Sequence, residues 1–140
     1  MIVLDTNVLS ALMQTQPDPV IVAWLDDQAA ESVWLSSITV FEARYGIALL
    51  ADGQRKHDLQ KSFEQLLQDD FAGRILMFDH SAANHAAELA AQRKAKGRPV
   101  DMRDTFIAGI VLTKRATLAT RNLKHFDDLS ASVINPWDEN

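Results

Sequence analysis

Short, mainly apolar runs alternate with longer amphipathic stretches along this chain. The runs have the length of buried strands and lie at residues 1–4, 32–36, 74–78, 116–120 and 132–134. The first run, Met1 to Leu4, is apolar on both faces, as a strand is in the middle of a parallel sheet. Strands that alternate with helices in this way predict an α/β sandwich around a mostly parallel sheet.

The amphipathic stretches predict helices, and polar residues at their starts are candidate N-caps because their side chains accept hydrogen bonds from free backbone N–H groups. Thr39-x-x-Glu42 has the form of a capping box. From the N-terminus onward, the candidate caps are Thr6 or Asn7, Asp18, Thr39, Asp79 or Ser81, and Asp101.

Two of the predicted helices have marked apolar faces. In the helix that follows Thr39, the residues at helical spacing are Phe41, Tyr45, Ala48 and Leu49. In the helix predicted over residues 54–71, they are Leu59, Phe63, Leu66, Leu67 and Phe71. A later, alanine-rich helix stops near Gly97, and its small side chains permit close contact with a neighbouring helix.

At 140 residues the chain has the size of one domain, residues 1–140, with a core that needs no disulfide or structural metal. It has no cysteine, which removes thiol nucleophiles and Cys-containing zinc sites and suits a reducing cytoplasm. Its apolar runs are too short for a signal peptide or a membrane span. We therefore expect a soluble, cytoplasmic protein that does not enter membranes.

The net charge of −5 argues against a protein that holds nucleic acid through a broad cationic face. A phosphate-bearing substrate would need a divalent metal or local cations, of which the candidates are Arg93, Lys94, Lys96, Arg98 and Arg103. Cations in the last turn of a helix also complement the helix dipole, and this explanation of residues 93–98 is the simpler one.

Three acidic residues stand where predicted strands meet predicted helices. Asp5 follows the first strand, Glu42 lies in the first turn of the helix after the second, and Asp104 lies in the first turn of the helix after Pro99. Each alone is explained as a helix cap. In a parallel sheet, however, these helix starts lie along one edge, so the carboxylates should converge. Converging carboxylates predict a site for Mg²⁺ or Mn²⁺.

Asp101 is the rival of Asp104 as a metal ligand, because residues three apart share a helix face. Asp101 is better placed as the N-cap. We therefore assign the ligand role to Asp104.

With these motifs the chain resembles the PIN domains, and among them the toxin ribonucleases of bacterial VapBC-type toxin–antitoxin modules. The matching segments are Asp5-Thr6-Asn7, Ile38-Thr-Val-Phe-Glu42, Asp104 with Ile107-Ala108, and Thr120-Arg121-Asn122. The ending Asn135-Pro136-Trp137 is similar to that of a related, FitB-like subgroup. The resemblance covers essentially the whole chain, and it implies a PIN-like three-layer α/β/α sandwich.

By this resemblance the metal-binding triad is Asp5, Glu42 and Asp104, the fourth catalytic position is Asn122, and the supporting residues are Thr6, Asn7 and Thr120. Family members often have an acid where this chain has Asn122, and often an Asp where it has His125, which leaves open whether one metal binds or two. Asn122 could ligate through its carbonyl oxygen or orient a water. Asp127 or Asp128 could also reach in, although both are more simply explained as solvated.

The resemblance further implies a metal-dependent endoribonuclease that cleaves RNA by metal-activated water and leaves 5′-phosphate and 3′-hydroxyl ends. It implies a homodimer and an antitoxin whose tail blocks the acidic pocket. Because a guanidinium suits clustered carboxylates, that tail should carry an arginine. Contact with DNA would come only through the antitoxin.

Two alternatives remain at this stage. Asp5 could be the nucleophile of a phosphatase similar to the haloacid dehalogenases, although those enzymes usually have a second acid where this chain has Asn7. The chain could instead be a binding module whose acidic pocket docks a basic peptide without catalysis. An Mg²⁺-dependent cleavage assay separates this module from the ribonuclease.

Other functional patterns are weak. No zinc site is expected, because His57, His80, His85 and His125 lack zinc spacing and are most simply surface or packing residues. The chain has no glycine-rich phosphate loop, so no nucleotide cofactor is expected.

Overall fold

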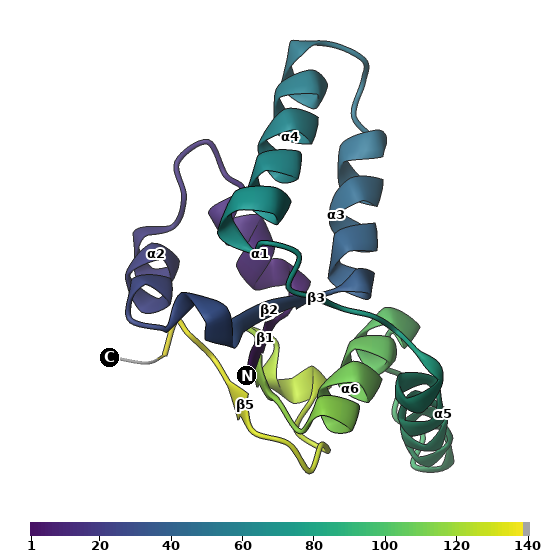
Figure 1. The fold of residues 1–140 in the computed structure, drawn as a ribbon. Helices are drawn as coiled ribbons and strands as arrows, with labels where there is room; N and C mark the ends of the chain where they lie inside the picture. The colour runs from purple at the N-terminus through teal and green to yellow at the C-terminus, as the bar shows by residue number, and fades with distance from the viewer. Residues whose placement is uncertain (139–140) are drawn as a thin grey trace.

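The computed structural model describes residues 1–138, and the last two residues of the predicted domain lie outside this range. Its centre is a five-stranded sheet with the order β3-β2-β1-β4-β5, in which each paired strand is parallel to its neighbour (Figure 1). The strands are β1 (Ile2–Leu4), β2 (Val33–Ser36), β3 (Ile75–Leu76), β4 (Thr117–Ala119) and β5 (Val133–Ile134). The predicted parallel sheet is confirmed, with β1 at its centre and with β3 shorter than the predicted strand over 74–78.

Helices cover both faces of this sheet (Figure 1). Helices α1, α3 and α4 lie on one side, where α3 and α4 form a hairpin that projects away from the strands, and α5 and α6 lie on the other. The α-helices are α1 (Thr6–Leu12), α2 (Pro19–Asp26), α3 (Ser37–Ala48), α4 (Gln54–Gln65), α5 (His80–Ala95) and α6 (Met102–Lys114). Two short 3-10 turns, Ala30–Ser32 and Leu123–His125, and a π-helical turn, Leu66–Asp70, complete the regular structure. This is the α/β/α sandwich that the sequence predicts.

Successive side chains of the central strands enter different cores, because side chains alternate across a strand. In β1, Leu4 packs in a cluster with residues of α1, α2 and α4, whereas Val3 packs with residues of α5 and α6. In β4, Ala119 belongs to the first cluster and Leu118 to the second. All four residues are fully buried. The β1–β4 pair therefore anchors both layers, and its carboxyl end is held firmly.

The helix starts partly differ from the prediction. Asp5, and not Thr6 or Asn7, is the N-cap of α1. Helix α3 is capped by Ser36, whose hydroxyl accepts a hydrogen bond from the Thr39 backbone N–H at 3.1 Å. Because α3 therefore begins at Ser37, the predicted capping box is wrong and Glu42 lies in the second turn. The predicted caps of α2, α5 and α6 are confirmed at Asp18, Asp79 and Asp101.

The predicted apolar face of α3 is wrong. Phe41, Tyr45 and Leu49 are 55%, 49% and 68% exposed, and Ala48 is exposed as well. The helix instead packs through its other apolar side, formed by Val40, Ala43 and Ile47. The predicted apolar face over residues 54–71 is confirmed, with Phe63, Leu67 and Phe71 buried and with Leu59 and Leu66 packed against them.

The alanine-rich helix α5 packs closely on α6, as its small side chains suggest. The contact passes over Gly109 of α6: a Cβ atom there would lie 2.5 Å from the Ala82 carbonyl oxygen and 2.8 Å from the Ala86 Cβ. Gly109 thus permits an approach that a larger residue would prevent. Among residues 1–138, no helix is long and apolar enough to cross a bilayer.

Candidate active site

Asp5 is a buried carboxylate at the carboxyl end of the central strand, 3% exposed. Its Oδ1 accepts a hydrogen bond from the Thr6 backbone N–H at 2.8 Å, and its Oδ2 accepts from Thr120 Oγ1 at 2.7 Å and from Asn7 Nδ2 at 3.2 Å. Every one of these donors is neutral, and no cation of residues 1–138 pairs with this carboxylate. Burial, together with the charges of Asp104 and Glu42, raises the pKa of Asp5 to about 6 against the lowering effect of the hydrogen bonds from Thr120 and Thr6.

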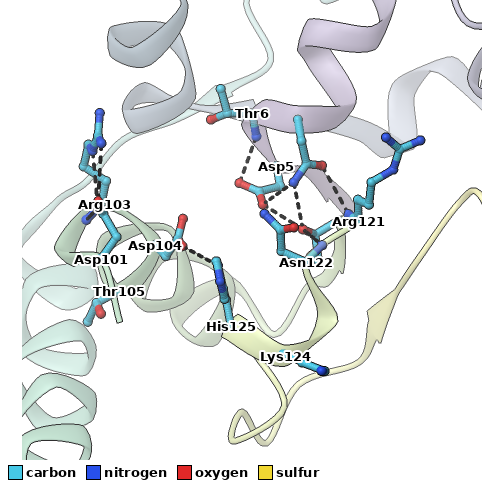
Figure 2. A network of polar contacts seen from close by, with 12 residues as sticks. Asp5, Thr6, Asp101, Arg103, Asp104, Thr105, Arg121, Asn122, Lys124 and His125 are labelled. Atoms are coloured by element: carbon cyan, nitrogen blue, oxygen red, sulfur yellow. Dashed lines mark hydrogen bonds and ion pairs between the residues drawn. The ribbon is translucent and has the colours of Figure 1, made fainter. Parts of the chain in front are cut away.

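The supports of Asp5 are themselves linked to the end of β4. Thr120 Oγ1 accepts from the Asn122 backbone N–H at 3.0 Å, and Asn7 Oδ1 accepts from the Arg121 backbone N–H at 3.2 Å (Figure 2). Residues 5–7 and residues 120–122 are therefore joined across the sheet edge. This network brings Asp5, Thr6, Asn7, Thr120 and Asn122 together, as the sequence predicts.

Glu42 reaches the same edge from the second turn of α3. Its Oε1 accepts a hydrogen bond from Thr6 Oγ1 at 2.9 Å, so that Thr6 contacts both Asp5 and Glu42. Its Oε2 lies 3.6 Å from an Arg103 guanidinium nitrogen. The Glu42 side chain is only 19% exposed, so it is held inside the site.

Asp104 comes from the first turn of α6. Its Oδ2 lies 2.9 Å from Nδ1 of His125, and Figure 2 shows the imidazole of His125 pointing toward this carboxylate. The charge of Asp104 contributes to the raised pKa of Asp5, so the two acids lie within electrostatic reach of each other. His125 is thus more than a surface or packing residue, because it contacts a predicted metal ligand.

Asp101 has a different environment. It caps α6 through a 2.8 Å hydrogen bond from the Arg103 backbone N–H, and its carboxylate also lies 3.3 Å from the Arg103 side chain. These contacts with Arg103 lower the pKa of Asp101. The N-cap role predicted for Asp101 is confirmed, which leaves Asp104 as the acid of this helix that faces Asp5.

The acids considered as extra ligands are engaged elsewhere. Asp128 pairs with Arg93 through two hydrogen bonds of 2.9 Å, which lower the pKa of Asp128, and Asp127 lies 2.7 Å from Arg98. The expectation that Asp128 is solvated is therefore wrong. Arg93 itself is 3% exposed and also donates to Thr105 Oγ1 and the His125 carbonyl oxygen. Arg93 cannot meet RNA there, but it fixes the turn that carries His125 against α6.

The acids at this edge offer oxygen donors, which Mg²⁺ and Mn²⁺ prefer. Mutual repulsion among Asp5, Glu42 and Asp104 is visible in the raised pKa of Asp5 and would be relieved by a divalent cation. Within residues 1–138, however, no three acidic or histidine side chains already stand in the arrangement of a metal site. The donor set fits the metal, provided that Glu42 and Asp104 turn away from Arg103 and His125.

Arg103 and His125 are the residues at this site that sequence reasoning did not assign. From the sequence, Arg103 is one of several candidate phosphate-binding cations, and His125 is a histidine without zinc spacing. The sequence gives only a weak indication that these two residues belong to the site. Arg103 directly precedes Asp104, and His125 stands where members of the family that the chain resembles often have an Asp.

The PIN domain family model matches residues 2–131. The chain is 41% identical over 139 residues to toxin FitB of Neisseria gonorrhoeae, and the match covers 99% of this chain and all of FitB. It is 39% identical over 138 residues to VapC ribonuclease Y4jK of Sinorhizobium fredii, and the match covers 99% of each chain. The crystal structure of FitAcB from Neisseria gonorrhoeae superposes with a TM-score of 0.90, at 41% identity, over 99% of this chain and all of that chain. The crystal structure of VapBC2 from Rickettsia felis, bound to a DNA fragment from its promoter, gives a TM-score of 0.80 at 26% identity, over 96% of this chain and 98% of that chain. The chain therefore belongs to the PIN-domain family, among its VapC-type and FitB-type toxins.

Proposed function

We propose that this chain is a metal-dependent endoribonuclease and the toxin of a two-component toxin–antitoxin module. The observation that carries the proposal is Asp5, a carboxylate buried at the carboxyl end of the central strand, whose pKa is raised by burial and by two neighbouring acids. An electrostatically uncompensated carboxylate at such an edge is typical of a catalytic site. Membership of a family that includes VapC ribonucleases supports RNA as the substrate.

In this proposal Asp5, Glu42 and Asp104 hold Mg²⁺ or Mn²⁺. The bound cation supplies Lewis acidity, which makes water more acidic and offsets negative charge on a scissile phosphate. Thr120 and Asn7 fix the Asp5 carboxylate, and Thr6 fixes Glu42, so the oxygens that face the substrate have defined positions. Asn122 is held near Asp5 through its backbone N–H bond to Thr120 and is the remaining candidate for orienting water.

Arg103 and His125 also have a part in the same proposal. Arg103 lies by Glu42 and His125 lies by Asp104, so each occupies oxygens that a metal would need. If Glu42 and Asp104 held a metal, both side chains would have to leave these carboxylates. Once displaced, their N–H groups are available to phosphate oxygens of the substrate.

The partners follow from the same charges. An antitoxin tail with an arginine would bridge these carboxylates, and the contact of Arg103 with Glu42 supports the fit of a guanidinium at this place. A homodimer is the proposed assembly, and cytoplasmic RNA is the proposed substrate pool. Metal and antitoxin arginine then exclude each other, because both draw on the same oxygens. Mn²⁺ should weaken the complex, and an arginine-to-alanine change in the tail should restore cleavage.

The test uses purified protein with total RNA, in EDTA or with Mg²⁺ or Mn²⁺. The wild type should cleave only with metal and leave 5′-phosphate ends, whereas Asp5→Asn should not cleave. Mn²⁺ should also raise the melting temperature of the wild type by several degrees and leave that of Asp5→Asn unchanged. A wild type that gains stability from Mn²⁺ without cleaving RNA would point to a binding module. Membership of the PIN-domain family argues against the phosphatase alternative. The purified protein should accordingly not hydrolyse a phosphomonoester, and hydrolysis of one would favour the phosphatase.

A further inference from the structure

The terminal Asn135-Pro136-Trp137 segment forms a fixed platform beside the active site. Trp137 Nε1 donates a hydrogen bond to Asp18 Oδ2 at 2.9 Å, and the Trp137 backbone N–H donates to Asn135 Oδ1 at 3.0 Å. The guanidinium carbon of Arg121 lies 3.8 Å from the centroid of the indole ring. The last turn of the described chain thus holds Arg121, a residue that directly follows the β4 end of the active site.

Arg121 differs from the other arginines near this site. Arg93 and Arg98 are paired with aspartates of the 126–128 segment, and Arg103 is paired with Asp101 and Glu42. Arg121 is exposed, and no carboxylate of residues 1–138 lies within ion-pair distance of its guanidinium. The guanidinium lies over the indole of Trp137, and the pKa of Asp18 is lowered by its hydrogen bond from Trp137 and also by the charge of Arg121. Among residues 1–138, Arg121 is therefore a held, exposed cation whose side-chain N–H groups have no hydrogen-bond or ion-pair partner.

The position of Arg121 is tied to that of Asp5. Its backbone N–H donates to Asn7 Oδ1, and Asn7 in turn donates to the Asp5 carboxylate. Figure 2 shows the Arg121 side chain directed away from Asp5 and Asp104. Arg121 thus lies at a fixed place beside the acidic site without entering it. A group bound by Arg121 would therefore lie beside the three acids and not among them.

We propose that Arg121, held over the Trp137 ring, binds an RNA backbone phosphate adjacent to the scissile one. This inference rests on the proposed ribonuclease function. A planar guanidinium with free N–H edges matches two phosphate oxygens. A chain with a net charge of −5 needs such local cations, because an anionic surface opposes an incoming RNA strand. Trp137 reduces the side-chain freedom that Arg121 would otherwise lose on binding.

The test measures binding of a short single-stranded RNA to the Asp5→Asn protein by fluorescence anisotropy over a series of KCl concentrations. Adding Arg121→Ala should weaken binding about tenfold and make the slope of log K against log salt shallower by about 0.7, the value for one phosphate of a single strand. Trp137→Leu should weaken binding in the same direction by freeing the arginine. Arg121→Lys should recover part of the affinity, since it restores the charge without the planar donor set.

Lys114→Ala is the matched control. Lys114 is exposed and precedes β4, whereas Arg121 follows β4. The two cations therefore lie beyond opposite ends of the same strand, and only Arg121 is at the carboxyl end, where the acids lie. Removing Lys114 should leave both affinity and salt slope unchanged. In proteins with Asp5 intact, Arg121→Ala should raise KM about tenfold and leave kcat unchanged, because the lost contact lies outside the reacting group.

The outcomes separate this inference from the proposed function. If the wild type cleaves RNA and Arg121→Ala has the same KM and the same salt slope, the proposed role of Arg121 is wrong. The ribonuclease function would not be affected by that result. A fall in antitoxin affinity with unchanged RNA affinity also overturns it, since Arg121 would then be a peptide contact. A wild type that neither binds nor cleaves RNA removes both proposals together.

Discussion

Replacing Asp5 with Asn should make the metal-free protein more stable at neutral pH. Burial raises the pKa of Asp5 from an ordinary 3.8 to about 6. A shift of this size corresponds to about 3 kcal/mol, which the folded state loses when Asp5 is ionised. Asparagine has nearly the same shape and no charge, so the variant avoids this loss.

Part of the gain is offset by hydrogen bonding. An asparagine at position 5 keeps an oxygen for the Thr6 N–H, and its amide nitrogen can donate to Thr120 once that hydroxyl rotates. Thr120 Oγ1 then accepts from this amide and from the Asn122 N–H, which fills its two lone pairs, so the Asn7 side chain loses both its acceptor at position 5 and its 3.3 Å contact with Thr120. The loss of these two long contacts costs about 1 kcal/mol in total, so we expect a net gain of about 2 kcal/mol near pH 7.

The gain should depend on pH with a defined sign. The carboxyl pKa is higher in the folded protein than in the unfolded chain, so below about pH 4 both states hold the proton and Asp5 costs nothing. As the pH rises from about 4 to about 6, the unfolded chain releases its proton first and wild-type stability falls. Above about pH 6 the loss is complete, so the advantage of Asp5→Asn should grow across this window and then level off.

The assay is urea unfolding in EDTA from about pH 4.5 to pH 7.5, with the variant and wild type compared at each pH. Asp101→Asn is the control, because it replaces an exposed N-cap with another good cap and should cost no more than about 1 kcal/mol. Two results would refute the reasoning: an Asp5→Asn protein that is less stable than wild type at pH 7, or a stability difference that is the same at pH 5 and pH 7.

Further substitutions test the assignments of the other residues. Asp104→Asn should abolish RNA cleavage while Asp101→Asn retains it, as measured by initial rates with Mn²⁺; the reverse pattern would exchange their roles. Gly109→Ala should lower the free energy of unfolding by about 3 kcal/mol, because the added Cβ would lie 2.5 Å from a backbone oxygen of α5. Gly46→Ala is its control: nothing lies within 4 Å of the added Cβ, so this change should raise the free energy of unfolding by up to about 1 kcal/mol. Arg93→Met removes both hydrogen bonds to Asp128 and leaves that carboxylate only its 3.8 Å contact with Arg98, so it should cost about 3 kcal/mol in thermal unfolding. A small cost would indicate that solvent already screens the Arg93–Asp128 pair.

The strand and helix order could be predicted because it depends on local periodicity, but the packed side of α3 could not. That helix carries two apolar stripes at helical spacing, one with Val40 and Ile47 and one with Phe41 and Tyr45. Only the first faces the sheet, because Ser36 ends β2 and caps the helix, which sets the rotation at which α3 leaves the strand. In the sequence only Thr39-x-x-Glu42 has the form of a capping box, so the pattern points to a later start than the one that Ser36 gives the helix.

The acids of the site could be predicted because strand ends and helix starts are readable in sequence, and parallel topology places them at one edge. The contacts of these acids with Arg103 and His125 could not be predicted. His125 comes from a turn after β4 whose position depends on buried Arg93, which bonds to the His125 carbonyl oxygen and to Thr105. Arg93 had a simple explanation as a cation in a last helical turn. Contacts that depend on a long-range anchor of this kind leave no local pattern.

The three acids divide the charge of the site unequally, and this division bears on how it is controlled. Glu42 has the Arg103 guanidinium within reach and Asp104 has the His125 imidazole as a partner, whereas the hydrogen-bond donors to Asp5 within residues 1–138 are all neutral. The deficit of positive charge is therefore greatest at Asp5, which is also the most buried of the three acids. Under the proposed function, a divalent cation removes this deficit in the active enzyme, and an antitoxin arginine removes it in the inhibited complex. Because either ligand relieves the same buried charge, each should stabilise the fold while excluding the other.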